Sequence, residues 1–296
     1  MAETTGTEHA ASEKWAHRAD LAENAINERH ASNLWGLPRT NLAVTAWPPT
    51  SKESLFVRWH YWWQAHYLDC LIDAFERRGT KTRRARVRHT VRGIRIRNGG
   101  KLTRNRYYDD RAWLSLALGR INEHTGRGTK KQTRDLEQAI LAGIDGLTGV
   151  LPWRVGETFY NVPSNGPAAI MMARTGRLDQ AIAVVYWVME NLINDDGLVM
   201  DGLRMRMHGP ELVRDIHPYC QGVMLGACLE IALALRERAG FSADESISGW
   251  ADADRVDDAM PYITFVRSLV HALALEMATP QGVIDWDTGD GDGGLF

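Results

Sequence analysis

Apolar residues recur every three to four positions along almost the whole chain, which is the spacing of one face of an α-helix. Alternation of apolar and polar residues, the pattern of a half-buried strand, is confined to short stretches such as residues 282–286. All ten prolines fall between the predicted helices or in a first turn, where a missing N–H costs little. The pattern predicts an all-α protein with helices over residues 13–31, 58–78, 82–97, 108–125, 131–147, 165–175, 178–194, 217–239 and 258–277.

Several of these helices are apolar on more than one side, which predicts two packed layers of helices. The helix over 58–78 carries an apolar stripe with Leu68 and Ile72, and a neighbouring stripe with Trp62 and His66. The first stripe suits a core and the second a polar cavity. We expect a disordered tail over residues 1–12 and a single helical domain, built as a double ring or a large bundle, over residues 13–296.

The composition is that of a soluble globular protein. Apolar residues make up 44% and charged residues 24% of the 296 positions, which excludes a disordered chain. A formal charge of -2 gives no general indication of a nucleic-acid or membrane partner. The first twenty residues lack a secretion signal and no uncharged run reaches the roughly 18 residues needed to span a bilayer. This predicts a cytoplasmic protein and leaves export by another route open.

Residues 77–97 hold ten basic residues and no acidic one. Closely spaced arginines are the footprint of a polyanion site, but the apolar stripe formed by Val87, Val91 and Ile94 favours a solvated amphipathic helix, so we expect no nucleic-acid partner. The tail DWDTGDGDGG lacks the ligand spacing of a calcium loop, and HExxH is absent. We therefore predict no metal.

The candidate catalytic residues follow a glycine turn at the start of a predicted helix. They are Asp109 and Asp110, which come directly after Tyr107 and Tyr108. Acidic residues at this place cap free N–H groups, but capping needs only one of them. Two adjacent carboxylates repel, which raises the proton affinity of one, and an acid beside an ionised partner is what glycosidic cleavage requires. Neighbouring Cα atoms lie about 3.8 Å apart, so carboxyls facing one cavity approach the ~5 Å separation of retaining glycosidases. Tryptophan is also abundant, with 11 against 8 Tyr, and its ring suits stacking on sugars.

Five segments, in order along the chain, carry a resemblance to glycoside hydrolase family 76, the endo-α-1,6-mannanase family. They are WHYWWQAH, YYDDRAWLSLALGR, LPWRVGETFYNVPSNGPAAI, HPYCQGVMLGACLE and GDGGLF. The resemblance implies an (α/α)6 barrel, no metal or organic cofactor and a retaining mechanism, in which Asp109 matches the nucleophile and Asp110 the general acid and base. Because the two are adjacent, the order of these roles stays open. Members of the family usually continue past GGLF, so we expect a barrel that is incomplete at its C-terminal end.

Further residues are candidates for binding the sugar. Asn165, Tyr219 and Gln221 match stretches that line the cleft of the family, and amide and phenol groups suit sugar hydroxyls; loop capping and core contacts are the alternative for each. Trp62 and Trp63 are roughly 100° apart on a helix, so one of them faces the cleft and the other the core. The predicted substrate-binding residues are Trp62, Trp63, Tyr108, Asn165, Asp201, Tyr219 and Gln221.

The sequence therefore predicts a retaining endo-α-1,6-mannanase that acts through a glycosyl-aspartate intermediate. One alternative is a mannan transglycosylase of the same fold, which passes the glycosyl group to a sugar hydroxyl. The other is a catalytically inactive protein that binds glycan or polyanion. The pattern carries no indication of oligomeric state.

Overall fold

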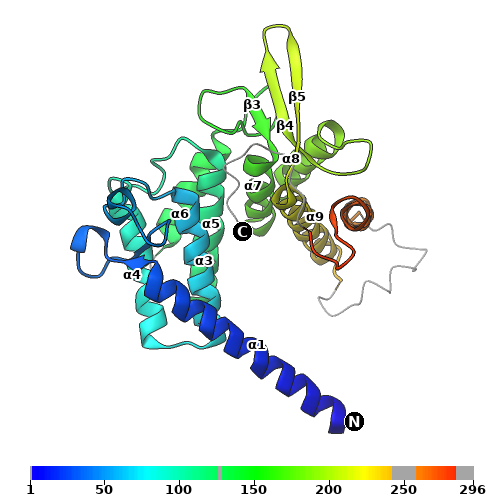
Figure 1. Cartoon of the computed structure of the whole chain (residues 1–296). Coiled ribbons are helices and arrows are strands. Elements are labelled where there is room, and N and C mark those ends of the chain that lie inside the picture. Colours follow the sequence, from blue (N-terminus) through cyan, green and yellow to red (C-terminus); the bar gives the residue numbers. More distant parts are fainter. Residues whose placement is uncertain (1, 126–128, 242–257, 285–296) are drawn as a thin grey trace. The chain divides into compact units, whose positions relative to one another are not determined.

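The computed structural model describes residues 2–125, 129–241 and 258–284, and the chain divides into two compact units. The first unit comprises Met1–Asn105 with Trp113–Leu136, and the second Arg106–Ala112 with Glu137–Phe296. The described helices are α1 (Ala2–Arg29), α2 (Ser51–Ser54), α3 (Tyr61–Arg77), α4 (Lys81–Arg97), α5 (Tyr108–Thr125), α6 (Lys130–Leu141), α7 (Val162–Arg174), α8 (Leu178–Asn191), α9 (Pro218–Arg238) and α10 (Met260–Ala272), which a π-helical turn η3 (Leu273–Met277) extends (Figure 1). All nine predicted helices are present.

Several boundaries differ from the prediction; α6, for example, ends at Leu141 instead of residue 147. Helix α1 begins at Ala2, so it includes residues 2–12, for which a disordered tail is expected, and no proline interrupts them. Helix α7 begins at Val162 because the side chain of Asn161 accepts a hydrogen bond from the N–H of Ser164, which caps the helix. Pro167 consequently lies inside α7 instead of in its first turn. The GDGGLF segment and the acidic tail lie outside the described residues.

The first unit is held by a core that α3, α4 and α5 share with the loops before α3. Its largest fully buried side chains include Phe56, Leu68, Ile72 and Leu118. A short two-stranded sheet, β1 (Ala31–Ser32) with β2 (Leu42–Ala43), joins this core. The buried amide of Gln64 on α3 bonds to the backbone N–H and C=O of Ala43, which fixes the sheet to the helix.

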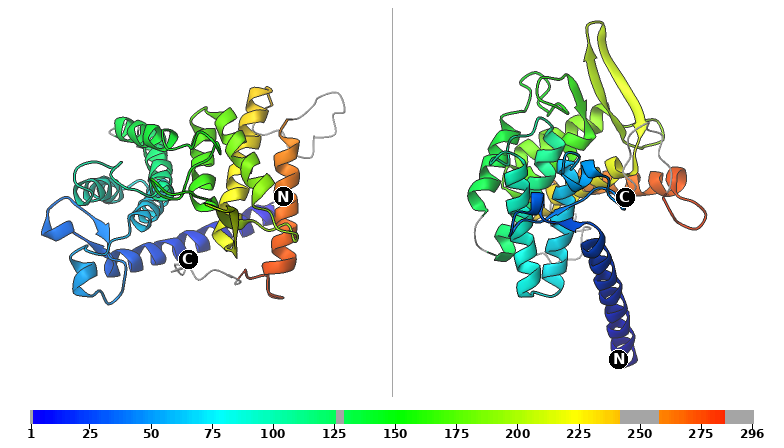
Figure 2. Two further views of the ribbon diagram at one scale, coloured as in Figure 1. Left: turned by 90° about the horizontal axis from the view of Figure 1, so that it is seen from above. Right: turned by 60° about the vertical axis from the view of Figure 1, so that its left-hand side comes forward.

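The second unit is built on α7, which packs against α8 and α9, while α10 packs against α9 (Figure 2). Gly166 of α7 faces Val223 of α9 so closely that an added Cβ would lie 2.6 Å from its side chain, so the close helix crossing requires glycine. Helix α9 is the one described helix long and apolar enough to cross a membrane. Its buried face, which includes Met224, Cys228 and Ile231, makes it a core helix of this unit.

The second unit also carries a sheet that is not among the predicted elements. Strands β3 (Phe159–Asn161), β4 (Met200–Arg206) and β5 (Gly209–Ile216) pair antiparallel in the order β3-β4-β5. The hairpin of β4 and β5 projects from the helices of its unit (Figures 1 and 2) and is exposed over much of its length. Apolar and polar residues do alternate from Leu203 to Met207, but the strands bury few of their side chains. A cross-strand ion pair joins Arg206 and Glu211 at 2.7 Å.

Candidate functional site

The two adjacent aspartates lie in the first turn of α5, and a loop of the second unit fixes that turn. The N–H of Tyr108 donates to the carbonyl of Trp153 at 3.0 Å, and the N–H of Val155 donates to the carbonyl of Arg106 at 2.8 Å. Residues Tyr107 and Arg154 pair between these bonds as an antiparallel bridge. These backbone contacts therefore join the start of α5 directly to the 153–155 loop.

The carboxylate of Asp109 accepts a hydrogen bond at each of its oxygens. Its Oδ1 accepts from the backbone N–H of Asp110 at 2.9 Å, and its Oδ2 accepts from the indole Nε1–H of Trp153 at 3.2 Å. Burial raises the pKa of Asp109 to about 6, although both of these hydrogen bonds act to lower it. The carboxylate is therefore oriented by two donors and still holds a proton more readily than an exposed aspartate does.

Asp110 is the more deeply buried of the pair, with 8% of its surface exposed. Both carboxylates stand at the N-terminal end of α5, where the helix dipole and the free N–H groups favour negative charge. Glycosidic cleavage requires two carboxyls, one that gives a proton and one that is ionised, and the first turn of α5 supplies two adjacent carboxyl groups.

A third carboxylate, that of Asp201, also lies in the second unit and interacts electrostatically with Asp109. It lies at the irregularity between Met200 and Gly202 where β4 slips in register against β5, a feature that redirects a side chain. Burial raises the pKa of Asp201 to about 6, and the charge of Asp109 contributes in the same direction, whereas His217 lowers it. Asp201, one of the predicted substrate-binding residues, therefore lies within electrostatic reach of Asp109.

Two stacked rings at the N-terminal end of α9 lie within electrostatic reach of Asp201. The rings of His217 and Tyr219 lie 5.4 Å apart with an angle of 25° between their planes. Burial raises the pKa of Tyr219, and the charges of Asp201 and Asp109 add to this shift, so its hydroxyl stays protonated. Tyr219 remains 36% exposed, so part of this residue is accessible from the solvent.

The structure gives Asn165 and Gln221 a different role from the substrate contact expected of them. Both amides are fully buried. Asn165 bonds to the N–H and C=O of Leu151 and to the C=O of Asn161. Gln221 bonds in the same way to Val199 and to the C=O of His217. These bonds engage both ends of each amide, so Asn165 positions the loop before Trp153 and Gln221 positions the strand that carries Asp201.

Tyr108, another of the predicted substrate-binding residues, is likewise a packing residue in the structure. Its ring is 7% exposed, lies against Gly143 and has the guanidinium of Arg111 over it at 4.9 Å. The aromatic group beside the aspartates is instead Tyr107 with Trp153, whose ring centroids are 5.0 Å apart.

Trp62 and Trp63 belong to the first unit, where α3 holds them in an aromatic cluster. Their rings meet edge to face at 5.4 Å, and Trp62 contacts His66 while Trp63 contacts His60. Both side chains are partly buried. That one of them binds the substrate stays a prediction.

Trp153 and His217 are the members of the site that the sequence does not single out. Both lie inside the segments that carry the family resemblance, LPWRVG and HPYCQG, but nothing in their local spacing indicates which carboxylate they approach. Among the described residues, no three His, Cys, Asp or Glu side chains gather as a metal site requires.

Comparison with known proteins places these features in a family. Residues 22–234 match the sequence profile of glycosyl hydrolase family 76. No curated protein matches the chain. Among solved structures, the Lin0763 protein from Listeria innocua is similar with a TM-score of 0.74 and 22% identity over 94% of this chain and 74% of its own.

Two further solved structures come from Salegentibacter sp. HEL1_6. Its GH76A α-1,6-mannanase has a TM-score of 0.71 and 23% identity over 90% of this chain and 72% of its own. An inactive variant of that enzyme, with two consecutive aspartates changed to alanine, forms a complex with α-1,6-mannotetrose and has a TM-score of 0.72 and 23% identity over 95% and 76% of the two chains. The predicted fold class, the helical (α/α)6 barrel of these enzymes, is confirmed. The chain thus belongs to glycosyl hydrolase family 76, a family of glycosidases.

Proposed function

We propose that this protein is a retaining endo-α-1,6-mannanase in which Asp109 is the nucleophile and Asp110 the general acid and base. The observation that carries the proposal is the pair of adjacent carboxyls at the start of α5, one of them bonded to Trp153 and within reach of the charge of Asp201. The similarity to an α-1,6-mannanase whose paired-aspartate variant is inactive and binds mannotetrose supports the substrate.

The hydrogen bonds of Asp109 favour its role as nucleophile. Both donors, the N–H of Asp110 and the indole of Trp153, stabilise the ionised carboxylate, which attacks the anomeric carbon and leaves again when the intermediate is hydrolysed. With a pKa of about 6, Asp109 is mostly ionised at pH 7. Asp110 then gives a proton to the departing glycosidic oxygen and, in the second step, takes one from the attacking water.

The central test is reducing-sugar release from linear α-1,6-mannan by the Asp109→Asn and Asp110→Asn variants. Asparagine keeps the shape of aspartate but can act neither as nucleophile nor as acid, so we expect each variant to lose at least about 10³-fold in kcat/KM. Asp179→Asn is the matched control, because this aspartate is exposed on α8 and its loss should leave activity unchanged. Activity near the wild-type level in both site variants would reject the proposal.

The configuration of the first product tests the retaining mechanism separately. Proton NMR during hydrolysis should show the α-anomer before mutarotation. Azide assigns the two roles with an aryl α-mannoside substrate, since it attacks the glycosyl-enzyme in Asp110→Ala and the free substrate in Asp109→Ala. The α-azide is expected from Asp110→Ala and the β-azide from Asp109→Ala, and the reverse result would exchange the roles.

A further inference from the structure

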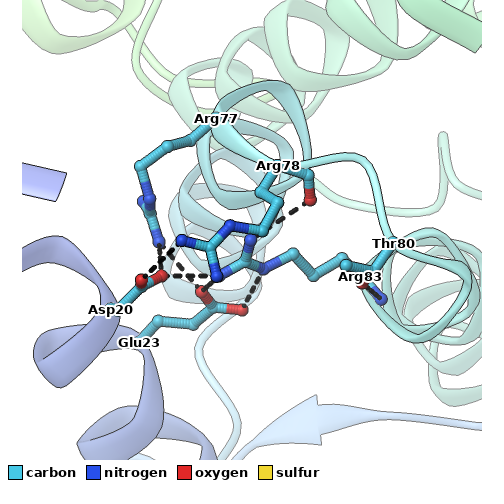
Figure 3. A network of polar contacts seen from close by, with 6 residues as sticks. All are labelled: Asp20, Glu23, Arg77, Arg78, Thr80 and Arg83. Atoms are coloured by element: carbon cyan, nitrogen blue, oxygen red, sulfur yellow. Dashed lines mark hydrogen bonds and ion pairs between the residues drawn. The ribbon is translucent and has the colours of Figure 1, made fainter. Parts of the chain in front are cut away.

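Seven of the nine arginines in residues 77–97 fall into two groups in the first unit. Arg77 and Arg83 each bond to Asp20 and Glu23 of α1, with nitrogen–oxygen distances from 2.5 to 3.0 Å (Figure 3). Arg78 reaches Asp20 at 3.4 Å. The side-chain hydrogen bonds from Arg77 and Arg83 lower the pKa of Asp20, so these arginines are paired with ionised carboxylates. This group connects α1 to α3 and α4.

The second group, Arg84, Arg88, Arg92 and Arg95, follows one side of α4 and lines a cavity of 750 Å³. The spacing of four, four and three residues places them on the same helix face. With a rise of 1.5 Å per residue, the row is about 16 Å long. A cavity of this volume lies in the range of sites that hold small molecules, roughly 300 to 1,000 Å³.

The positive charge of this row has no acidic partner in the cavity. No aspartate or glutamate lines it, and Arg84, Arg88 and Arg92 form no ion pair among the described residues. Burial lowers the pKa of the neighbouring His89, and the charges of Arg88 and Arg92 lower it further. Four like charges along one helix repel each other, so a bound anion would stabilise this face.

The remainder of the cavity is mainly apolar, which limits the kind of anion that fits. The guanidinium of Arg84 lies over the ring of Phe75 at 5.4 Å, at the border between the charged and the apolar parts. A polyanion would use the arginines and leave this apolar surface in water, and a neutral lipid would leave the arginines unpaired. The apolar lining residues are Ile72, Phe75, Val87, Val91, Ile96 and Ile121.

We propose that this cavity binds a single-chain amphiphile with an anionic headgroup, such as an alkyl phosphate or a fatty acid. The planar guanidinium groups hold the headgroup through paired N–H donors, and the alkyl chain covers the apolar surface between α3, α4 and α5. This site is independent of the proposed glycosidase activity.

Calorimetric titration of the full chain with dodecyl phosphate, below its micelle concentration, tests the proposal. We expect one molecule bound per chain, with an affinity that rises about fourfold for each methylene from octyl to dodecyl phosphate. Inorganic phosphate and dodecyl maltoside, which each lack one half of the ligand, should bind at least tenfold more weakly. Arg88→Gln and Arg92→Gln change exposed side chains, so they should fold normally by circular dichroism and lose at least tenfold in affinity.

Arg78→Gln is the matched control, because it removes the same charge from the same segment but lies outside the cavity. Its affinity for dodecyl phosphate should equal that of the wild type, and an equal loss in this variant would overturn the proposal. Affinity that does not depend on chain length would also overturn it. Binding to heparin, or to vesicles containing phosphatidylglycerol, without binding of monomeric dodecyl phosphate would assign the arginines to a polyanion or a membrane surface instead.

Discussion

Substitution of Trp153 by phenylalanine isolates the hydrogen bond that the indole donates to Asp109. Phenylalanine keeps an aromatic ring against Tyr107 and Phe159, whose centroids lie 5.0 and 6.2 Å from that of Trp153. It removes the Nε1–H that reaches Asp109 Oδ2 at 3.2 Å. The change therefore acts mainly on the charge state of the proposed nucleophile.

The expected shift follows from the strength of this bond. A hydrogen bond to a charged group contributes about 1.5 to 3 kcal/mol, and the distance of 3.2 Å lies at the long limit for N–H···O, which favours the lower value. One pKa unit corresponds to about 1.4 kcal/mol. Since the bond lowers the pKa of Asp109, its loss should raise that pKa by about one unit above the value of about 6.

The assay is kcat/KM on α-1,6-mannan as a function of pH between about 4.5 and 9. The acidic limb reports the protonation of the nucleophile, so wild-type activity should fall as the pH drops through about 6, and the limb of Trp153→Phe should lie about one unit higher. Trp187→Phe, on α8 against Tyr160, is the control and should keep the wild-type limb. A limb that stays in place or moves to lower pH would refute the assigned role of the indole.

Three further substitutions test the arrangement around the pair. Asp201→Asn removes a negative charge near Asp109, so the acidic limb should move to lower pH, opposite to Trp153→Phe; an upward shift would contradict the electrostatic contact. Gln221→Ala leaves a buried backbone N–H unpaired and should lower the free energy of unfolding by at least about 2 kcal/mol in urea titrations, where an unchanged midpoint would exclude the positioning role. Gly143→Ala places a methyl group against the buried ring of Tyr108 and should cost about 1 to 3 kcal/mol by calorimetry, unless the ring can move aside.

Local patterns account for the parts of the structure that the sequence predicts well. Apolar spacing depends on neighbours within a few turns, so the helices are found near their expected places, and the Asp109–Asp110 pair is recognisable from its position at a helix start. The hairpin of β4 and β5 is missed because the alternation in its sequence is short, from Leu203 to Met207, and its stability depends on pairing across strands.

The roles of the polar residues depend on distances between atoms, which the spacing of residues along the sequence does not give. In the sequence, Asn165 and Asp201 are equally plausible as residues that bind the sugar. In the structure, the buried amide of Asn165 is hydrogen-bonded to backbone groups of Leu151 and Asn161. Asp201, in contrast, interacts electrostatically with Asp109 from a strand far along the chain. Burial decides the difference, because an amide with all its partners inside the protein has none left for a sugar.

The sequence by itself determined the helical class, the paired carboxylates and the basic segment. Only the tertiary structure decided which arginines are neutralised and which line a cavity, because the partners of Arg77 and Arg83 lie on α1, more than fifty residues earlier in the chain. It also decided that Trp153 orients Asp109, across 44 residues. Charge and hydrogen-bonding capacity are properties of single residues, but the pKa and the role of each group depend on which distant residues the fold brings within a few ångströms of it.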